Sequence, residues 1–259
     1  MFPADHVIGN EVLFLSVIRK AIGLAASGEN IVVLGVKPTR PETGYGYIET
    51  GKTLANGVVR VRRFTEKPNL QRAEEFLSAG NYFWNSGIFI WSARTLANAM
   101  REHLPETSPL LEEIAAAWGT PDFDRIFVEL YPRCENVSVD VAVLEPRSSK
   151  GERRSNLFCL PADFGWNDLG SWTALYEHSL AHAEQTDAEN NVAQTAGSLA
   201  VSASGNYVYS PKKFVALVGV KDLVVVETDD AILVTTRSNS QDVSKVVKEL
   251  IASGHEELV

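Results

Sequence analysis

The chain has 259 residues, of which 45% are hydrophobic and 22% charged, and its formal net charge is −9. This length can build one large domain or two modest ones, and the composition is that of an ordinary soluble globular protein. The acidic balance argues against a groove for a polyanion, which would need a basic face, so we expect no nucleic-acid partner.

Membrane and disulfide classes are also disfavoured. No apolar run approaches the ~18 residues of a membrane span, and residues 1–6 lack the basic start and apolar body of a signal peptide. We therefore expect a cytoplasmic protein with no membrane partner. Cys134 and Cys159 have neither metal-ligand spacing nor the density of a secreted scaffold, so we predict two reduced thiols.

The first predicted elements follow the pattern of an α/β layer. Residues 11–27 carry apolar side chains at helical spacing, and Gly28 is a plausible stop for that helix. Residues 31–36 are a continuous apolar run, which predicts a strand buried on both faces. Such a strand after a helix is typical of parallel pairing.

A loop that alternates glycine with tyrosine comes next. Gly44, Tyr45 and Gly46 precede an extended segment. Glycines could bring backbone amides against a ligand, or the loop could be only a strand-entry turn with aromatic packing.

An acid and a base lie side by side at the end of the next predicted strand. Residues 58–64 alternate like a half-exposed strand and lead to Glu66 and Lys67, after which residues 70–79 form a short amphipathic helix. Charges at a strand end are often only solvated, but an α/β sheet binds its ligand beyond the carboxyl ends of its strands.

The densest aromatic stretch, residues 81–91, contains Asn85 and then an apolar strand. The amide of Asn85 offers both donors and an acceptor to a vicinal diol. Residues 138–145 begin like a capped helix, in which Asp140 could cap or could face the site. Three further helices are predicted, at residues 93–103, 108–118 and 123–131.

One turn, residues 164–172, presents Asp168 between two tryptophans and two glycines. Glycines let the backbone approach a ligand closely, and large rings fix the loop by burial. The strand expected at residues 156–160 delivers this turn. The alternative is that Asp168 only caps the helix at residues 171–177.

Composition changes after His178. Residues 182–191 are polar and acidic, which is typical of a linker or a surface excursion, and we predict a domain boundary between residues 184 and 185. Beyond it we expect a small β-rich unit that ends in a helix at residues 241–252. The predicted β segments are residues 199–203, 207–210, 214–220, 223–227 and 231–235.

Six strings occur in a fixed order between residues 3 and 172. They are Pro-Ala-Asp-His, Pro-Glu-Thr-Gly-Tyr-Gly-Tyr-Ile, Phe-Thr-Glu-Lys-Pro, Trp-Asn-Ser-Gly-Ile-Phe, Ser-Val-Asp-Val-Ala and Gly-Trp-Asn-Asp-Leu-Gly-Ser-Trp. Together they resemble bacterial mannose-1-phosphate guanylyltransferases, a sugar-nucleotidyltransferase family. The resemblance implies an α/β fold, with a Rossmann-like nucleotidyltransferase sheet in residues 1–184 and a C-terminal β-rich, left-handed-β-helix-like unit in residues 185–259. It also implies a homodimer in many members.

The same resemblance assigns roles to single residues. It implies that Asp5 and Asp168 hold a catalytic Mg²⁺, an ion that prefers carboxylate, water and phosphate oxygens. It places Lys67 on the sugar phosphate, as a catalytic and binding residue. The implied substrate-binding set is Gly44, Tyr45, Gly46, Glu66, Lys67, Asn85 and Asp140, with the role of Asp140 open.

The implied reaction is attack by a phosphate oxygen of mannose 1-phosphate on the α-phosphorus of GTP, which gives GDP-mannose and pyrophosphate. Family members carry an N-terminal Gly-rich phosphate loop with an Arg-Leu-Trp-Pro signature, and this sequence has neither it nor another phosphate-cradle motif. We therefore expect a truncated enzyme that is inactive alone. Two alternatives stay open: a non-catalytic remnant that binds sugar phosphate or a complete subunit, and a related hexose-1-phosphate nucleotidyltransferase with another sugar or base.

Overall fold

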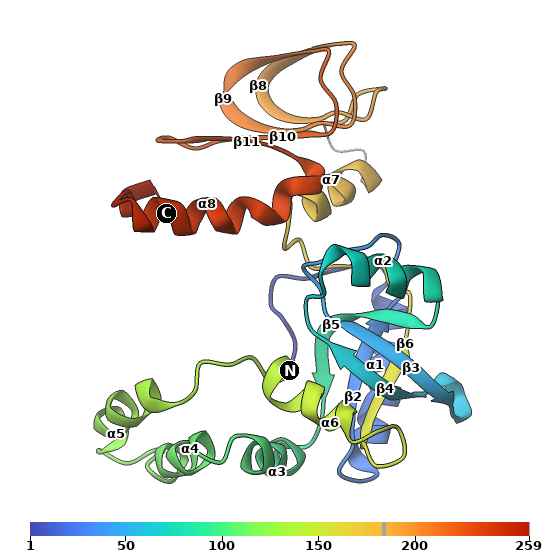
Figure 1. The fold of residues 1–259 in the computed structure, drawn as a ribbon, viewed down its shortest axis with the longest axis vertical. Helices are drawn as coiled ribbons and strands as arrows, with labels where there is room; N and C mark the ends of the chain where they lie inside the picture. The colour runs from blue at the N-terminus through green and yellow to red at the C-terminus, as the bar shows by residue number, and fades with distance from the viewer. Residues whose placement is uncertain (183–184, 259) are drawn as a thin grey trace. The chain divides into compact units, whose positions relative to one another are not determined.

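The computed structural model describes residues 1–182 and 185–258, which form two compact units (Figure 1). The first unit comprises Met1–Ala4 and Ile8–Trp166, and the second comprises Asp5–Val7 and the chain from Asn167 on. Within the described residues, no helix has the length and apolar character needed to cross a membrane. The boundary predicted between residues 184 and 185 touches residues 183–184, which lie outside the described part.

A closed five-stranded sheet with the order β2-β5-β3-β4-β6 forms the centre of the first unit. The predicted parallel pairing of residues 31–36 is present between β2 and β6, whereas β2 pairs antiparallel with β5. The sheet is therefore mixed. Its strands are β2 (Ile31–Val36), β3 (Tyr47–Thr53), β4 (Val59–Thr65), β5 (Tyr82–Ile90) and β6 (Leu157–Pro161).

Both faces of β2 are buried, as its apolar run predicts. Val33 belongs to one hydrophobic cluster, and Val32 and Leu34 belong to another that includes helix α1 (Glu11–Ala26). Successive strand residues point to opposite faces, so these two clusters lie on the two sides of the strand. The helix begins at a cap in which Asn10 Oδ1 accepts a 3.0 Å hydrogen bond from the backbone N–H of Leu13.

The other helices of the first unit agree with the sequence prediction, with one difference in kind. The start predicted near residue 138 exists, since Ser138 Oγ accepts a hydrogen bond from Val141 N–H at 3.4 Å. The turn that follows, Asp140–Leu144, is a π-helix rather than an α-helix, because Glu145 N–H donates to the Asp140 carbonyl five residues back. The α-helices are α2 (Leu70–Ala79), α3 (Ala93–His103), α4 (Thr107–Ala116), α5 (Phe123–Leu130) and α6 (Glu145–Ser149).

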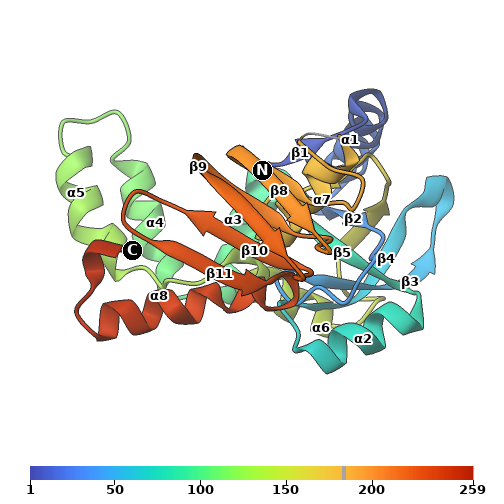
Figure 2. The ribbon, with the colours of Figure 1, turned by 90° about the horizontal axis from the view of Figure 1, so that it is seen from above.

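The second unit contains a four-stranded sheet with the order β11-β10-β9-β8 (Figure 2). Three consecutive strands run parallel and stack Val192, Tyr207 and Val224 in register. In Figure 1, β8 and β9 are long paired arcs, which is the arrangement of successive β-helix coils. The elements are α7 (Trp172–Ala181), β8 (Val192–Val201), β9 (Tyr207–Val218), β10 (Leu223–Glu227), β11 (Ile232–Thr236) and α8 (Val243–Ala252).

Two predicted strand boundaries in this unit are wrong. The segments at residues 207–210 and 214–220 are parts of the single strand β9, and residues 199–203 cover only the end of β8. Pro211 and two lysines interrupt the apolar pattern of β9, but this strand is largely exposed there, so no core position is lost.

Two buried asparagines link the coils. Asn206 is fully buried, and its Nδ2 donates to Asn191 Oδ1 at 2.7 Å and to the Val220 carbonyl at 3.2 Å. Its Oδ1 accepts from Leu223 N–H at 2.9 Å. These bonds tie three segments together at one corner and leave the buried amide fully hydrogen-bonded.

Candidate functional site

The Gly44–Gly46 loop is fixed by aromatic packing on one side. The ring of Tyr45 lies 5.2 Å from that of Trp84 and 5.3 Å from that of Trp166, centroid to centroid. Gly44 N–H donates to Glu42 Oε1 at 3.0 Å, and the Gly46 carbonyl accepts from Asn85 N–H at 2.8 Å. Ring packing and hydrogen bonds therefore fix the conformation of this loop.

Gly46 is required here by close approach. A Cβ at this position would lie 2.6 Å from Glu66 Oε2 and 2.9 Å from Phe64 Cζ. Both distances are shorter than any unstrained contact, so the backbone of Gly46 lies directly against the carboxylate of Glu66.

The side chains of Asn85 and Asp140 are hydrogen-bonded to each other, so both can contribute to one site. Asn85 Nδ2 donates to Asp140 Oδ1 at 2.8 Å, and Asn85 Oδ1 accepts from Gly87 N–H at 3.1 Å. The two bonds fix the orientation of the amide. One amide hydrogen of Asn85 and further lone pairs of Asp140 stay available for a ligand. The structure thus brings Asp140 into this cluster.

Glu66 is the most perturbed acid of the cluster. Its side chain is 20% exposed, and its Oε2 is buried without a hydrogen-bond partner among the described residues. The pKa of Glu66 is raised to about 7, chiefly by burial and also by the nearby carboxylates of Asp140 and Glu145, whereas Lys67 lowers it. A buried carboxylate oxygen without a donor is costly, and a ligand hydroxyl would satisfy it.

Lys67 follows Glu66 with a strained backbone. Its φ is +41°, a left-handed conformation that costs a non-glycine residue about 1–2 kcal/mol. The ammonium Nζ lies 4.0 Å from Glu66 Oε1, and the side chain is 65% exposed. The strained turn holds a mobile positive charge next to the acids, where an anionic group can reach it.

We predict that Gly46→Ala will lower the free energy of unfolding by about 1–3 kcal/mol, because the added methyl collides with buried groups. Chemical denaturation measures the change. Gly23→Ala is the matched control: a Cβ at Gly23 in α1 meets nothing within 4 Å, so this change should stabilise the chain by up to about 1 kcal/mol. Equal effects of the two substitutions would contradict the close packing at Gly46.

The turn that holds Asp168 is closed by local hydrogen bonds. Asp168 Oδ1 accepts from Gly170 N–H at 3.0 Å, and Asn167 Oδ1 accepts from Leu169 N–H at 2.8 Å. The cap of α7 is Ser171, whose Oγ accepts from Ala174 N–H at 3.1 Å. The alternative in which Asp168 caps this helix is therefore wrong.

A short antiparallel ladder precedes this turn and was missed in the sequence. The two-residue strands β1 (Val7–Ile8) and β7 (Trp166–Asn167) pair, and Gly9 N–H donates to the Gly165 carbonyl at 3.0 Å. Gly165 has φ +67°, and a Cβ there would lie 3.0 Å from Gly9 Cα, so glycine is needed. A strand of two residues leaves no alternation for sequence reasoning to detect.

Asp5 and Asp168 both belong to the second unit. The Asp5 side chain is 84% exposed, and its Oδ1 lies 4.0 Å from His6 Nε2. Among the described residues, no group of three or more His, Cys, Asp or Glu side chains could hold a metal. Two carboxylates nevertheless fit Mg²⁺, which commonly takes one or two acids and completes its shell with water and substrate phosphate.

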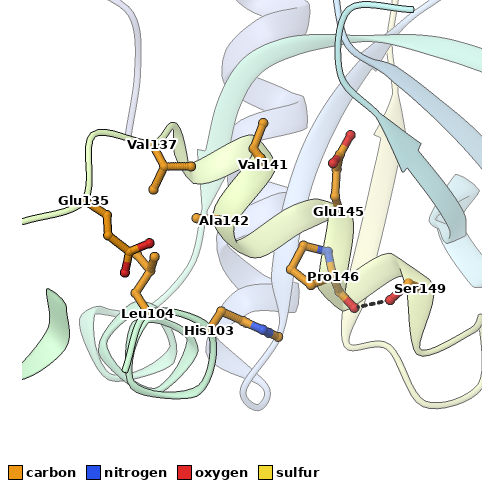
Figure 3. Close-up of a pocket in the computed structure, with 9 residues that line it drawn as sticks. All are labelled: His103, Leu104, Glu135, Val137, Val141, Ala142, Glu145, Pro146 and Ser149. Carbon is orange, nitrogen blue, oxygen red and sulfur yellow. Dashed lines mark hydrogen bonds between the residues drawn. The ribbon is translucent and has the colours of Figure 1, made fainter. Parts of the chain in front are cut away.

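A hollow of about 520 Å³ lies beside the π-helix in the first unit (Figure 3). Glu145 lines it, and so does His103, whose pKa is lowered by burial. Sequence reasoning missed Glu145, because it stands at the end of the helical stretch predicted at residues 138–145 and a glutamate usually faces solvent. Its Oε1 accepts from Glu66 N–H at 3.0 Å, which joins it to the candidate site.

Comparison with known proteins adds the following. A family model described as nucleotidyl transferase matches residues 1–185, and one described as MannoseP isomerase/GMP-like beta-helix domain matches residues 197–250. The chain is 39% identical over 260 residues to a putative mannose-1-phosphate guanylyltransferase of Vibrio cholerae serotype O1 and 38% identical over 263 residues to the mannose-1-phosphate guanylyltransferase of Escherichia coli K12. Each alignment covers 99% of this chain and 52% of the relative, so the chain spans about half the length of these proteins.

A solved structure is similar over almost the whole chain. The crystal structure described as a mannose-1-phosphate geranyltransferase from Thermus thermophilus superposes with a TM-score of 0.75 at 32% identity. The match covers 96% of this chain and 68% of that one.

Proposed function

We propose that this chain, which belongs to the nucleotidyl transferase family, catalyses guanylyl transfer from GTP to mannose 1-phosphate, with GDP-mannose and pyrophosphate as products. The names of the Vibrio cholerae and Escherichia coli relatives support mannose over another hexose. The resemblance also implies that the nucleotide carries guanine and that the chain forms a homodimer, and both stay predictions.

The observation that carries the proposal is the cluster of Glu66, Lys67, Asn85 and Asp140 around Gly46. It offers an unpaired buried carboxylate oxygen, a fixed amide and a cation within one small region. Sugar hydroxyls donate to carboxylates and exchange hydrogen bonds with amides, and an ammonium attracts a phosphate. A hexose 1-phosphate presents these two kinds of group next to each other.

The proposed metal acids both lie in the second unit. Asp5 precedes strand β1 by two residues and Asp168 directly follows strand β7, and these two strands pair, which supports a common location for the two acids. The carboxylates of Asp5 and Asp168 would hold the divalent ion, which neutralises the charge that develops on the transferred phosphoryl group. The chain's own residues would orient the sugar phosphate, and this reaction needs no protein nucleophile.

Titration calorimetry with mannose 1-phosphate in the presence of Mg²⁺ tests this proposal. Glu66→Ala and Asn85→Ala should each weaken binding by about 1–3 kcal/mol, or roughly 5- to 150-fold, because each leaves a buried partner unpaired. Glu113→Gln, an exposed acid on α4, is the control and should leave binding unchanged.

Two further arms define the substrate and the metal acids. Glucose 1-phosphate should bind more weakly than mannose 1-phosphate, and equal affinity would favour the alternative of another hexose. Asp168→Asn should weaken the binding of Mg²⁺, measured by titration calorimetry, while sugar-phosphate binding persists. Binding that survives both Glu66→Ala and Asn85→Ala unchanged would falsify the sugar site.

A further inference from the structure

The end of β4 lacks a strand partner on one edge. β4 pairs with β3 up to Thr65, whereas on the other edge it pairs with β6 only through Val59 and Arg60. Beyond Arg60, backbone N–H groups on that edge need other acceptors. Phe64 and Glu66 are two residues apart, so their N–H groups point to the same edge.

Helix α6 supplies those acceptors from its side chains. Ser148 Oγ accepts from Phe64 N–H at 2.9 Å, and Glu145 Oε1 accepts from Glu66 N–H at 3.0 Å. Glu145 and Ser148 are three residues apart and therefore lie on one face of the helix. Ser148, which is 1% exposed, also donates its hydroxyl to the Glu145 carbonyl at 2.9 Å.

We propose that Glu145 is a positioning residue for the sugar-phosphate site: its carboxylate fixes the backbone of Glu66, and thereby the direction of the Glu66 carboxylate and the Lys67 turn. This inference rests on the proposed function for its ligand. Lys67, with φ +41°, follows the fixed peptide directly, so a strained turn begins at a backbone group that Glu145 holds. In Figure 3 the Glu145 carboxylate points away from His103 and Ser149, two other residues that line the hollow.

The charge of Glu145 and its hydrogen bond can be separated by substitution. Glutamine keeps a side-chain oxygen that accepts from Glu66 N–H but removes the negative charge. Alanine removes both. The groups that face the Glu66 carboxyl are Asp140, Lys67 and Glu145 itself, and Glu145 is one of the two that raise its pKa.

The experiment compares wild type, Glu145→Gln and Glu145→Ala by amide hydrogen exchange at Glu66 and by titration with mannose 1-phosphate. Glu145→Ala should speed exchange of the Glu66 amide and weaken binding, each roughly tenfold, as expected when one hydrogen bond to a charged group is lost. Glu145→Gln should change the exchange rate of the Glu66 amide and the affinity for mannose 1-phosphate by no more than about twofold. It should nevertheless lower the pH midpoint of binding, because the Glu66 pKa falls when a nearby negative charge is removed. Glu113→Gln should change none of these readouts.

The outcomes distinguish the two proposals. If the Glu66 amide hydrogen of Glu145→Ala exchanges at the wild-type rate, the positioning role is overturned, whether or not the sugar phosphate binds. Loss of stability in Glu145→Ala with unchanged binding and an unchanged pH midpoint would show a structural role alone and also overturns it. Wild-type protein that does not bind mannose 1-phosphate contradicts the proposed function, while the amide exchange still decides whether Glu145 fixes the Glu66 backbone.

Discussion

The free energy of unfolding of the wild-type chain, measured relative to Glu66→Gln, should fall by on the order of 3 kcal/mol between about pH 4.5 and pH 8. The pKa of Glu66 is raised from 4.5 to about 7, chiefly by burial. Each pKa unit corresponds to 1.36 kcal/mol of differential interaction. Between these two pKa values the folded state binds a proton that the unfolded state has released, so stability is full below pH 4.5 and is lost as pH rises through 7.

Denaturation followed by tryptophan fluorescence measures this difference, since four of the five tryptophans (84, 91, 118 and 166) lie in the first unit. Glutamine stands in for the neutral carboxyl, so the titrations of other groups largely cancel. Asp140→Asn should shrink the effect, because the Asp140 carboxylate is the largest charge contribution to the raised pKa. A difference that is flat with pH would contradict the raised pKa.

Sugar-phosphate binding should depend on pH in the opposite sense. A hydroxyl donates better to an ionised carboxylate than to a neutral one, so affinity should rise as Glu66 loses its proton near pH 7. The ionised Glu66 carboxylate therefore lowers the free energy of unfolding but accepts a stronger hydrogen bond from the ligand. Such a trade of stability for a poised group is common at functional sites.

Much of this arrangement could be predicted from the sequence because it rests on local signals. The helix at residues 11–27 and the doubly buried strand at residues 31–36 follow from apolar spacing, and both are confirmed. The resemblance to mannose-1-phosphate guanylyltransferases is confirmed by the relatives, and so is the nucleotidyltransferase domain followed by a β-helix-like unit.

The unpredicted parts depend on contacts between distant residues. Glu145 accepts a hydrogen bond from Glu66, 79 residues away, and nothing in the local pattern of either residue indicates the pairing. The antiparallel pairing of β2 with β5 was missed for the same reason, because strand order depends on chain topology. Metal binding by Asp5 and Asp168 stays a prediction.

The asparagines of the second unit could have been found. Asn191 and Asn206 each immediately precede a stacked position, Val192 or Tyr207, and the interval is fifteen residues. A repeat of this length in a β-rich segment is typical of coils that stack on one another. The sequence instead predicted a linker or a surface excursion at residues 182–191, because their polar composition is the same whether the side chains face solvent or bond to one another.

Asn206→Ala should therefore destabilise the second unit by about 3 kcal/mol or more. The substitution removes three hydrogen bonds at a position with 0% exposure. It leaves the Leu223 N–H without its acceptor, whereas the Val220 carbonyl keeps the Ser204 N–H and Asn191 Oδ1 keeps the backbone N–H of residue 206. Each buried group that loses its hydrogen bond costs about 1–3 kcal/mol, and linked groups lose more together than singly. Hydrogen exchange of the backbone amides in β9 measures the loss of stability in this unit directly.

Two companion variants make the result specific. Asn206→Asp keeps an oxygen for Leu223 N–H but faces Asn191 Oδ1 and the Val220 carbonyl with an acceptor, so it should destabilise at least as much as alanine. Asn98→Ala removes two exposed hydrogen bonds in the first unit, one that Asn98 Nδ2 donates to Glu29 at 2.8 Å and one that Asn98 Oδ1 accepts from Arg101 at 3.0 Å. It should change stability by no more than about 0.5 kcal/mol. If Asn206→Ala costs no more than Asn98→Ala, the buried amide is not what joins the coils, and the parallel strand pairs hold them together without it.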